Sequence, residues 1–157
     1  MISGVDLSIL TYDAPEKQRK SAETLANSVK RLIKFLLTYP KILVAAVNGY
    51  AKGFGVTLLP YCDIVFSSVK ATFSLESYAK LGQIPEAFAY HVFPSSNRAG
   101  FNEVLLLGKS ITATEAKELG LVSSVIWPDR FLENIVPHME KLENMPSEGL
   151  KIVHGYN

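Results

Sequence analysis

The residues best suited to chemistry lie in a glycine-rich turn, NGYAKGFG, at positions 48–55. An apolar stretch at residues 42–47 precedes this turn, and residues 56–61 are expected to form a short helix after it despite Pro60. Glycines let the backbone approach a ligand closely, and the first turn of a helix presents unpaired N–H groups with a partial positive field. Such a turn can stabilise an anion, either a bound phosphate or an oxyanion that develops during a reaction. A plain tight turn explains the glycines equally well.

The spacing of these glycines excludes two common nucleotide-binding motifs. No Gly-Lys-Ser/Thr completes the turn, so it is not a phosphate-binding loop. Glycines at 49, 53 and 55 also do not match the Gly-x-Gly-x-x-Gly fingerprint of dinucleotide-binding proteins.

The candidate metal ligands are scattered along the chain. His91, His138 and His154 lack the spacing of a metal site, so structural or surface roles are expected for them. Cys62, just ahead of a predicted strand, is expected to be a buried, small apolar residue. The sequence therefore predicts no metal centre.

Composition limits the kinds of protein that could position such a site. The chain has 157 residues, 48% of them hydrophobic, and a formal net charge of +1, which excludes global disorder and a basic nucleic-acid footprint. One cysteine excludes a disulfide scaffold, and no apolar stretch is long enough for a membrane span. The first residues show neither the basic nor the apolar region of a signal peptide. We expect a globular domain with no nucleic-acid partner and no membrane.

The elements predicted around the turn alternate between strands and helices, which indicates an α/β fold. A long amphipathic helix is expected to follow Asp13 as N-cap, with Pro15 and Glu16 in its first turn, and to end near Thr38. The stretch at 42–47 is apolar on both faces and predicts a buried parallel strand. Further strands are expected at 63–66, 71–74 and 122–127, a turn at 82–85, and helices at 87–93, 97–107, 112–120 and 130–143.

Two of these helices carry specific end signals. Thr112 is expected as N-cap with Glu115 at the third helical position, and Gly120 as C-cap. Pro137 is expected to interrupt the last helix, because proline removes a backbone donor.

Several segments, taken in order, carry a family resemblance: SGVDL at 3–7, AVNGYAKGFG at 46–55, CDIV at 62–65, ATF at 71–73, and GKSITA at 108–113 with EA at 115–116 and GLV at 120–122. Together they closely resemble the enoyl-CoA hydratase/isomerase (crotonase) superfamily. The resemblance implies a crotonase-type ββα superhelix, or spiral. It also implies that residues 1–157 form a single crotonase-like domain, a fragment of the longer family domain that lacks its N-terminal strands and C-terminal helices.

One subgroup of this superfamily is closest. LGQIPE at 81–86 resembles the Leu-Gly-Gln-x-Pro-Glu segment of peroxisomal-type Δ3,Δ2-enoyl-CoA isomerases, as does VTLL at 56–59. Hydratases of the family carry two glutamates, and this chain has Thr57 and Ser77 in their places. The chain departs from the isomerases after Glu86, where AFAY replaces Gly-Cys-Ser-Ser and could narrow the acyl pocket.

The resemblance also implies the site. Glu86 corresponds to the catalytic base, and the N–H groups of Val5 and Phe54 correspond to the oxyanion hole. Further substrate-binding positions by the same resemblance are Ser3, Gly4, Asp6, Leu7, Gly53 and Leu81. The substrate would be a coenzyme A thioester, with no separate cofactor and no metal. Local sequence offers simpler roles for some of these carboxylates, since Glu86 suits the first turn of a helix and Asp6 and Asp63 suit turn caps.

These implications lead to one expected function and two rivals. The expected function is a Δ3,Δ2-enoyl-CoA isomerase of fatty-acid β-oxidation, peroxisomal or mitochondrial and a homotrimer by resemblance, although no targeting signal is visible. The first rival is a non-catalytic acyl-CoA-binding module of the chromodomain-Y-like type, in which aspartate replaces the glutamate. The second is another thioester reaction, hydration or hydrolysis. Glu76 is expected to be a helix-start residue, and Lys52 either contacts a CoA phosphate or is simply solvated.

Overall fold

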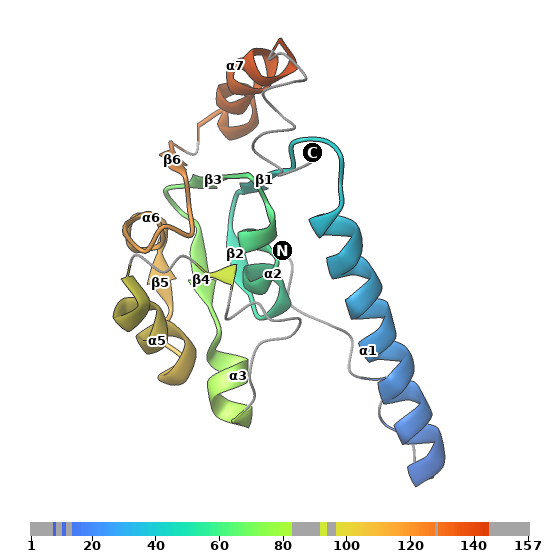
Figure 1. The fold of residues 1–157 in the computed structure, drawn as a ribbon. Coiled ribbons are helices and arrows are strands. Elements are labelled where there is room, and N and C mark those ends of the chain that lie inside the picture. The colour runs from blue at the N-terminus through green and yellow to red at the C-terminus, as the bar shows by residue number, and fades with distance from the viewer. Residues whose placement is uncertain are drawn as a thin grey trace.

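Two three-stranded sheets form the centre of the computed structural model, which describes residues 8, 11, 14–82, 92–93, 97–127 and 129–144 (Figure 1). The first sheet has the order β1-β3-β6 and consists of β1 (Val44–Val47), β3 (Ile64–Ser68) and β6 (Ser124–Ile126), all parallel. The second has the order β2-β4-β5 and consists of β2 (Tyr50–Lys52), β4 (Thr72–Ser74) and β5 (Ile111–Thr112). Strand β4 pairs in parallel with β2 and antiparallel with β5. The predicted α/β class is confirmed.

The first four strands alternate between the two sheets. Strand β1 leads directly into β2, and β3 leads into β4, while β1 pairs with β3 and β2 with β4. The β3–β4 segment therefore lies parallel to the β1–β2 segment, as successive turns of a spiral do. The glycine-punctuated turn predicted over residues 48–55 is not one continuous turn, because β2 lies inside it. Ala51 is buried between exposed Tyr50 and Lys52, the alternation of a strand with one covered face.

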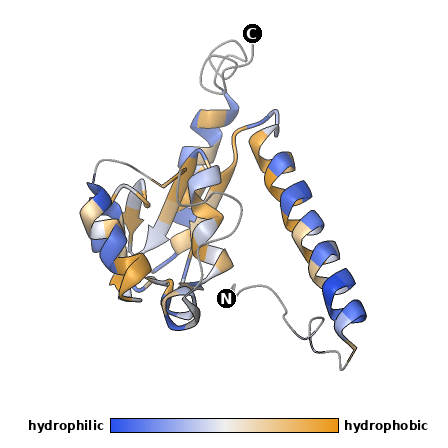
Figure 2. Cartoon of the chain, turned by 60° about the horizontal axis from the view of Figure 1, so that its bottom comes forward, coloured by the Kyte–Doolittle hydropathy of each residue, from blue (hydrophilic) through white to orange (hydrophobic). Residues whose placement is uncertain are grey.

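Helix α1 (Pro15–Leu37) runs along one side of the molecule, and part of its hydrophobic surface faces the rest of the chain (Figures 1 and 2). Ile33 is its buried residue, whereas Phe35 and Leu37 are exposed. Its N-cap is Ala14, which makes no side-chain cap hydrogen bond, so the predicted N-cap Asp13 is wrong. A residue before proline is driven to the extended conformation, and Ala14 has φ −96° and ψ 118°. Proline then takes the first helical position, where its missing N–H costs nothing.

The helix expected at 56–61 begins earlier and is split. Helix α2 (Phe54–Thr57) starts inside the glycine-rich turn, and a 3₁₀ turn (Leu59–Tyr61) follows it. Pro60 lies in the first turn of this 3₁₀ segment, where no N–H is needed. The prediction therefore erred by placing the helix start two residues too late.

Four further helices complete the described chain: α3 (Glu76–Leu81), α5 (Arg98–Leu106), α6 (Ala113–Glu118) and α7 (Phe131–Glu143). The capping box of α6 is confirmed, since the Glu115 N–H donates to Thr112 Oγ1 at 3.3 Å and the Thr112 N–H donates to Glu115 Oε2 at 2.8 Å. Gly120 is not the C-cap, which is Leu119. Gly120 follows it with φ +78° and closes a Schellman motif with hydrogen bonds from Gly120 and Leu121 back to α6.

Two other predictions need correction. Pro137 does not interrupt α7, which continues through it. Its ring lies on the exposed side of the helix, where water can satisfy the carbonyl that loses its donor. Strand β1 is parallel as predicted but is only half-buried, and Ala46 is exposed. Among the described residues, β1 lies at the edge of its sheet and pairs with β3 alone.

The main core lies between the sheets and the helices α2, α3, α5 and α6. Its most deeply buried large side chains are Phe73, Leu75, Val56 and Val104. Phe66 of β3 forms a smaller cluster with Phe131 and Ile135 of α7. The expected helix at 87–93 falls mainly outside the described residues.

Candidate functional site

The start of α2 is fixed by Gly53. This buried residue has φ 51° and ψ −122°, a conformation that side-chain-bearing residues avoid. Its N–H donates to the Ser74 carbonyl at 2.9 Å, and its own carbonyl accepts from Val56 at 2.9 Å and Thr57 at 3.2 Å. Ser74 contributes only a backbone atom here, so no side-chain signal in the sequence pointed to it. The end of β4 thus anchors the turn that opens the helix.

The N–H groups of Phe54 and Gly55 follow from this geometry. They are the first two of α2 and precede its first intrahelical hydrogen bond, which the Val56 N–H makes. Backbone donors at this position face developing negative charge without reorganising. The glycine-rich turn therefore does what its spacing indicated, in that it presents backbone donors at a helix start.

Thr57 ends α2 and is almost fully buried, with 1% of its surface exposed. Its hydroxyl donates to the Phe54 carbonyl at 3.1 Å. This hydrogen bond ties the last residue of the single helical turn to the first. Thr57 therefore stabilises the segment that carries the backbone donors, and it offers no carboxylate.

Two side chains on α3 lie at or next to the position where a hydratase, by resemblance, has its second glutamate. Ser77 is exposed. Glu76 is the first residue of α3 and forms an ion pair with Lys80 at 2.6 Å. The hydrogen bond and the charge of Lys80 lower the pKa of Glu76, whereas a carboxylate that takes a proton from carbon needs a raised pKa. The prediction of Glu76 as a helix-start residue is confirmed.

Most of the other predicted site residues lie outside the described residues. These are Ser3, Gly4, Val5, Asp6, Leu7 and Glu86. The backbone of Leu81 ends α3, and Gly82 caps it in the left-handed conformation with φ 60°. Of the predicted site, the structure therefore describes the side formed by Gly53 and Phe54, and the roles of the remaining residues stay predictions.

Three other polar candidates have ordinary surroundings. The Lys52 Nζ lies 5.9 Å from the centre of the Tyr50 ring, on an exposed surface. Cys62 is half-buried rather than fully buried, and burial, with a smaller contribution from Asp63, raises the pKa of its thiol to about 11. The predicted turn cap Asp63 accepts a hydrogen bond from the Leu43 N–H at 2.7 Å. None of these arrangements indicates a nucleophile.

In the part of the chain that the structure describes, no three His, Cys, Asp or Glu side chains come close enough together to hold a metal ion. No helix among the described residues has the length and apolar character needed to cross a membrane.

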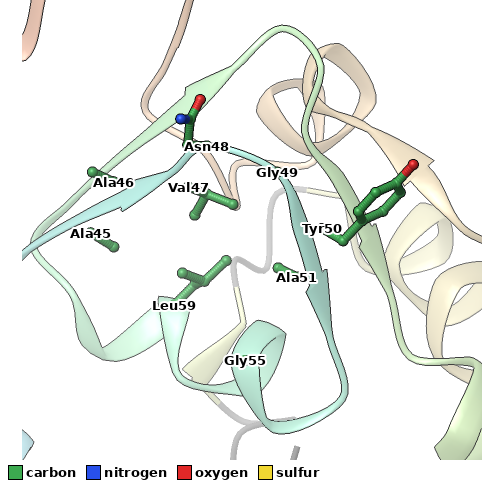
Figure 3. Close-up of a pocket in the computed structure, with 9 residues that line it drawn as sticks. All are labelled: Ala45, Ala46, Val47, Asn48, Gly49, Tyr50, Ala51, Gly55 and Leu59. Carbon is green, nitrogen blue, oxygen red and sulfur yellow. The ribbon is translucent and has the colours of Figure 1, made fainter. Parts of the chain in front are cut away.

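A cavity of about 590 Å³ lies beside β1, β2 and α2 (Figure 3). Val47, Ala51 and Leu59 point into it, while Asn48 and Tyr50 extend away from it. No Asp, Glu, His, Lys or Arg lines it among the described residues, so its walls supply no acid or base. Gly55, at the start of α2, is one of its lining residues, so the cavity reaches the helix start that carries the backbone donors.

Replacing Gly53 with alanine is expected to lower the free energy of unfolding by about 1–3 kcal/mol, because a Cβ is strained at this φ and ψ. Denaturant unfolding monitored by circular dichroism measures the change. Gly49→Ala is the matched control, since a Cβ there meets no atom within 4 Å and its backbone is not in the left-handed region. Equal stabilities for the two variants would contradict the role given to Gly53.

Comparisons with known proteins place these features in context. A family model described as enoyl-CoA hydratase/isomerase matches residues 2–155. The chain is 42% identical over 138 residues to the peroxisomal enoyl-CoA delta isomerase 3 of Mus musculus, covering 85% of this chain and 42% of that protein. It is 34% identical over 151 residues to human enoyl-CoA delta isomerase 2, covering 96% and 38%. It is also 38% identical over 134 residues to the human chromodomain Y-like protein, covering 85% and 22%.

Solved structures of enoyl-CoA hydratases and related proteins are also similar to this chain. An enoyl-CoA hydratase from Mycobacterium marinum superposes with a TM-score of 0.69 at 33% identity, covering 78% of this chain and 56% of that one. Human enoyl-coenzyme A hydratase domain-containing protein 3 superposes with a TM-score of 0.79 at 23% identity, covering 98% and 59%, and supports the fold alone. The chain thus spans less than half of these curated relatives and a little over half of these solved structures.

Proposed function

Because the chain belongs to the enoyl-CoA hydratase/isomerase family and has the crotonase fold, we propose that it acts as a Δ3,Δ2-enoyl-CoA isomerase. The observation that carries this proposal is Thr57. It lies buried in α2 at the position where, by resemblance, a hydratase has a carboxylate. The identity to two enoyl-CoA delta isomerases supports the same choice.

The proposed reaction needs one base and one anion site. The Glu86 carboxylate removes a proton from C2 of the 3-enoyl thioester, and the C–H electron pair moves into the conjugated system to give a dienolate. The N–H groups of Phe54 and Val5 hold the negative thioester oxygen. Protonated Glu86 then returns the proton to C4, which leaves the double bond between C2 and C3 and regenerates the carboxylate. No cofactor takes part.

The donor at Phe54 contributes through its fixed position. Loss of one oxyanion donor typically raises a barrier by about 2.7–4 kcal/mol. The Thr57 hydroxyl and the Ser74 carbonyl keep the first turn of α2 in place through their hydrogen bonds to Phe54 and Gly53. The positions Ser3, Gly4, Asp6, Leu7, Gly53 and Leu81 are proposed to bind the acyl-CoA around this centre.

A second candidate is a non-catalytic acyl-CoA-binding module. The identity to the human chromodomain Y-like protein favours it. Glutamate at position 86 favours the enzyme, because by resemblance the chromodomain-Y-like proteins have aspartate there. The two candidates differ in turnover rather than in binding.

The experiment that separates them offers 3-enoyl-CoA to the whole protein and follows the absorbance of the conjugated thioester. Isomerisation raises this absorbance, and acyl-CoA binding is measured in parallel by calorimetry. Binding with turnover supports the isomerase. Binding without turnover supports the module, and the absence of both contradicts the acyl-CoA assignment.

We propose further that the whole protein is a homotrimer. Leu106 and Leu107 at the end of α5 are 68% and 78% exposed, although Phe101, Val104 and Leu105 of the same segment are buried. Apolar side chains on a second face favour burial by another subunit. Light scattering at micromolar concentration is expected to give three times the monomer mass, and a monomer would contradict the proposal.

The name of the mouse relative also supports a peroxisomal location. By resemblance a mitochondrial location is the alternative, and imaging of the tagged whole protein distinguishes the two.

A further inference from the structure

Ser74, the last residue of β4, accepts hydrogen bonds from two different elements. Its carbonyl accepts from the Gly53 N–H at 2.9 Å, and its Oγ accepts from the Glu76 N–H at 3.3 Å. The first bond continues the β2–β4 ladder by one residue beyond the Lys52–Ser74 pair. The second satisfies the first N–H of α3, which has no acceptor within its own helix. One buried serine, 6% exposed, therefore joins the turn that opens α2 to the start of α3.

The start of α3 is also packed closely from another side. Gly108, beyond the end of α5, has φ +66°, and a Cβ at this position would lie 3.1 Å from the Cα of Glu76 and 3.1 Å from the Cβ of Ala79. Leu75, which precedes α3, is fully buried. Atoms packed at this density leave little free space to absorb a shift. The position of α3 is therefore coupled to that of β4 and of the segment after α5.

We infer that Ser74 is a positioning residue for the proposed isomerisation, and that its two hydrogen bonds fix α3 relative to the Phe54 N–H. The inference rests on the proposed function, in which Phe54 supplies an oxyanion donor and Glu86 the base. The chain reaches Glu86 five residues after Leu81, the last residue of α3. A misplacement of reacting groups by about 1 Å can cost up to about 10²-fold in rate. Ser74 therefore acts on the reaction through the two elements that it joins.

Ser68 provides a matched comparison, since it makes the same side-chain hydrogen bond elsewhere in the fold. It ends β3 as Ser74 ends β4, it is fully buried, and its Oγ accepts from the Lys70 N–H, also at 3.3 Å. Its carbonyl accepts from the Ala71 N–H at 2.9 Å. These bonds close the loop between β3 and β4, whereas those of Ser74 reach two separate elements.

The test is Ser74→Ala in the whole protein, which removes the hydroxyl and keeps the carbonyl that anchors Gly53. We expect kcat for 3-enoyl-CoA to fall about tenfold while KM changes by less than about twofold, because geometry is lost at the reacting groups rather than in binding. Ser74→Thr keeps the hydroxyl and is expected to restore kcat. Ser68→Ala makes the same chemical change and is expected to lower the free energy of unfolding by a similar amount without changing kcat.

Amide hydrogen exchange gives a second readout that does not depend on catalysis. Ser74→Ala is expected to speed exchange at the Glu76 and Gly53 N–H groups together, although Gly53 keeps its acceptor, and Ser68→Ala is expected to speed it at neither. A parent protein without isomerase activity would contradict the proposed function, and the coupling through Ser74 would then be judged by exchange alone.

Three results would overturn the inference: a Ser74→Ala variant with the kcat of the parent, an equal loss of kcat in Ser68→Ala, or faster exchange at Glu76 without any at Gly53. Ser74→Cys replaces Ser74→Ala if the latter loses its native circular dichroism spectrum, since a thiol nearly keeps the side-chain size but is only a weak acceptor.

Discussion

Glu86→Gln in the whole protein is expected to lower turnover of 3-enoyl-CoA by about 10²–10⁴-fold, the usual contribution of general acid–base catalysis. Glutamine keeps the size and polarity of the side chain but cannot accept and return a proton. Binding of acyl-CoA is expected to stay intact. Steady-state kinetics with calorimetric binding on the same preparation measures both quantities.

Glu76→Gln is the control for this variant. Glu76 is an exposed carboxylate that pairs with Lys80, and it has no part in the proposed reaction. Its replacement is expected to leave turnover near the parent value. Turnover of Glu86→Gln above about a tenth of the parent value would remove Glu86 from the mechanism, since the lower limit of this kind of catalysis is about 10²-fold.

The whole protein is expected to isomerise 3-enoyl-CoA at least about 100-fold faster than it hydrates crotonyl-CoA, because each missing acid–base group costs about 10²-fold or more. Hydration needs a positioned water and two carboxylates. Neither position supplies a carboxylate here: the buried Thr57 hydroxyl donates its hydrogen bond to the Phe54 carbonyl, and Ser77 is an exposed serine. Loss of the conjugated thioester absorbance from crotonyl-CoA measures hydration. Comparable rates on the two substrates would contradict the isomerase assignment.

The double variant Thr57→Glu with Ser77→Glu is a weaker test of the same point. Position 77 is exposed and accepts a carboxylate easily. Position 57 is buried, so a glutamate there would bury an uncompensated charge and lower the free energy of unfolding by several kcal/mol. A small gain in hydration is expected alongside a clear loss of stability. The comparison of 3-enoyl-CoA with crotonyl-CoA is therefore the stronger test of isomerase against hydratase.

The sequence predicted those elements whose signals are local. The capping box of α6 was predicted correctly because Thr112 and Glu115 are three residues apart and need no distant partner. Strand β2 was missed for the opposite reason. It has three residues, and its pairing partner β4 lies far along the chain, so the glycines on either side outweighed the strand signal. Helix α1 was predicted well in its length, but its start depended on the conformation that Pro15 imposes on Ala14.

The candidate site divides in the same way. Spacing alone singled out the glycine-rich turn as a possible source of backbone donors, and the family resemblance assigned Gly53 and Phe54 within it. The buried state of Thr57 and the Ser74 carbonyl that anchors Gly53 could not be predicted, because both depend on how β4 and α2 pack together. Glu86 was identified only through the family resemblance. Nothing in its neighbouring residues distinguishes a base from a helix-start carboxylate.

The alternation of strands between the two sheets has a consequence for folding. Every pairing except that of β4 with β5 skips at least one strand of the other sheet, so Val44 must find Ile64 and Phe66 must find Ser124. Neither sheet can be completed before the intervening segments of the other have been positioned, and most of the ladder depends on closing long loops. The two sheets are therefore expected to fold and unfold together in one cooperative transition, at a rate limited by these distant encounters.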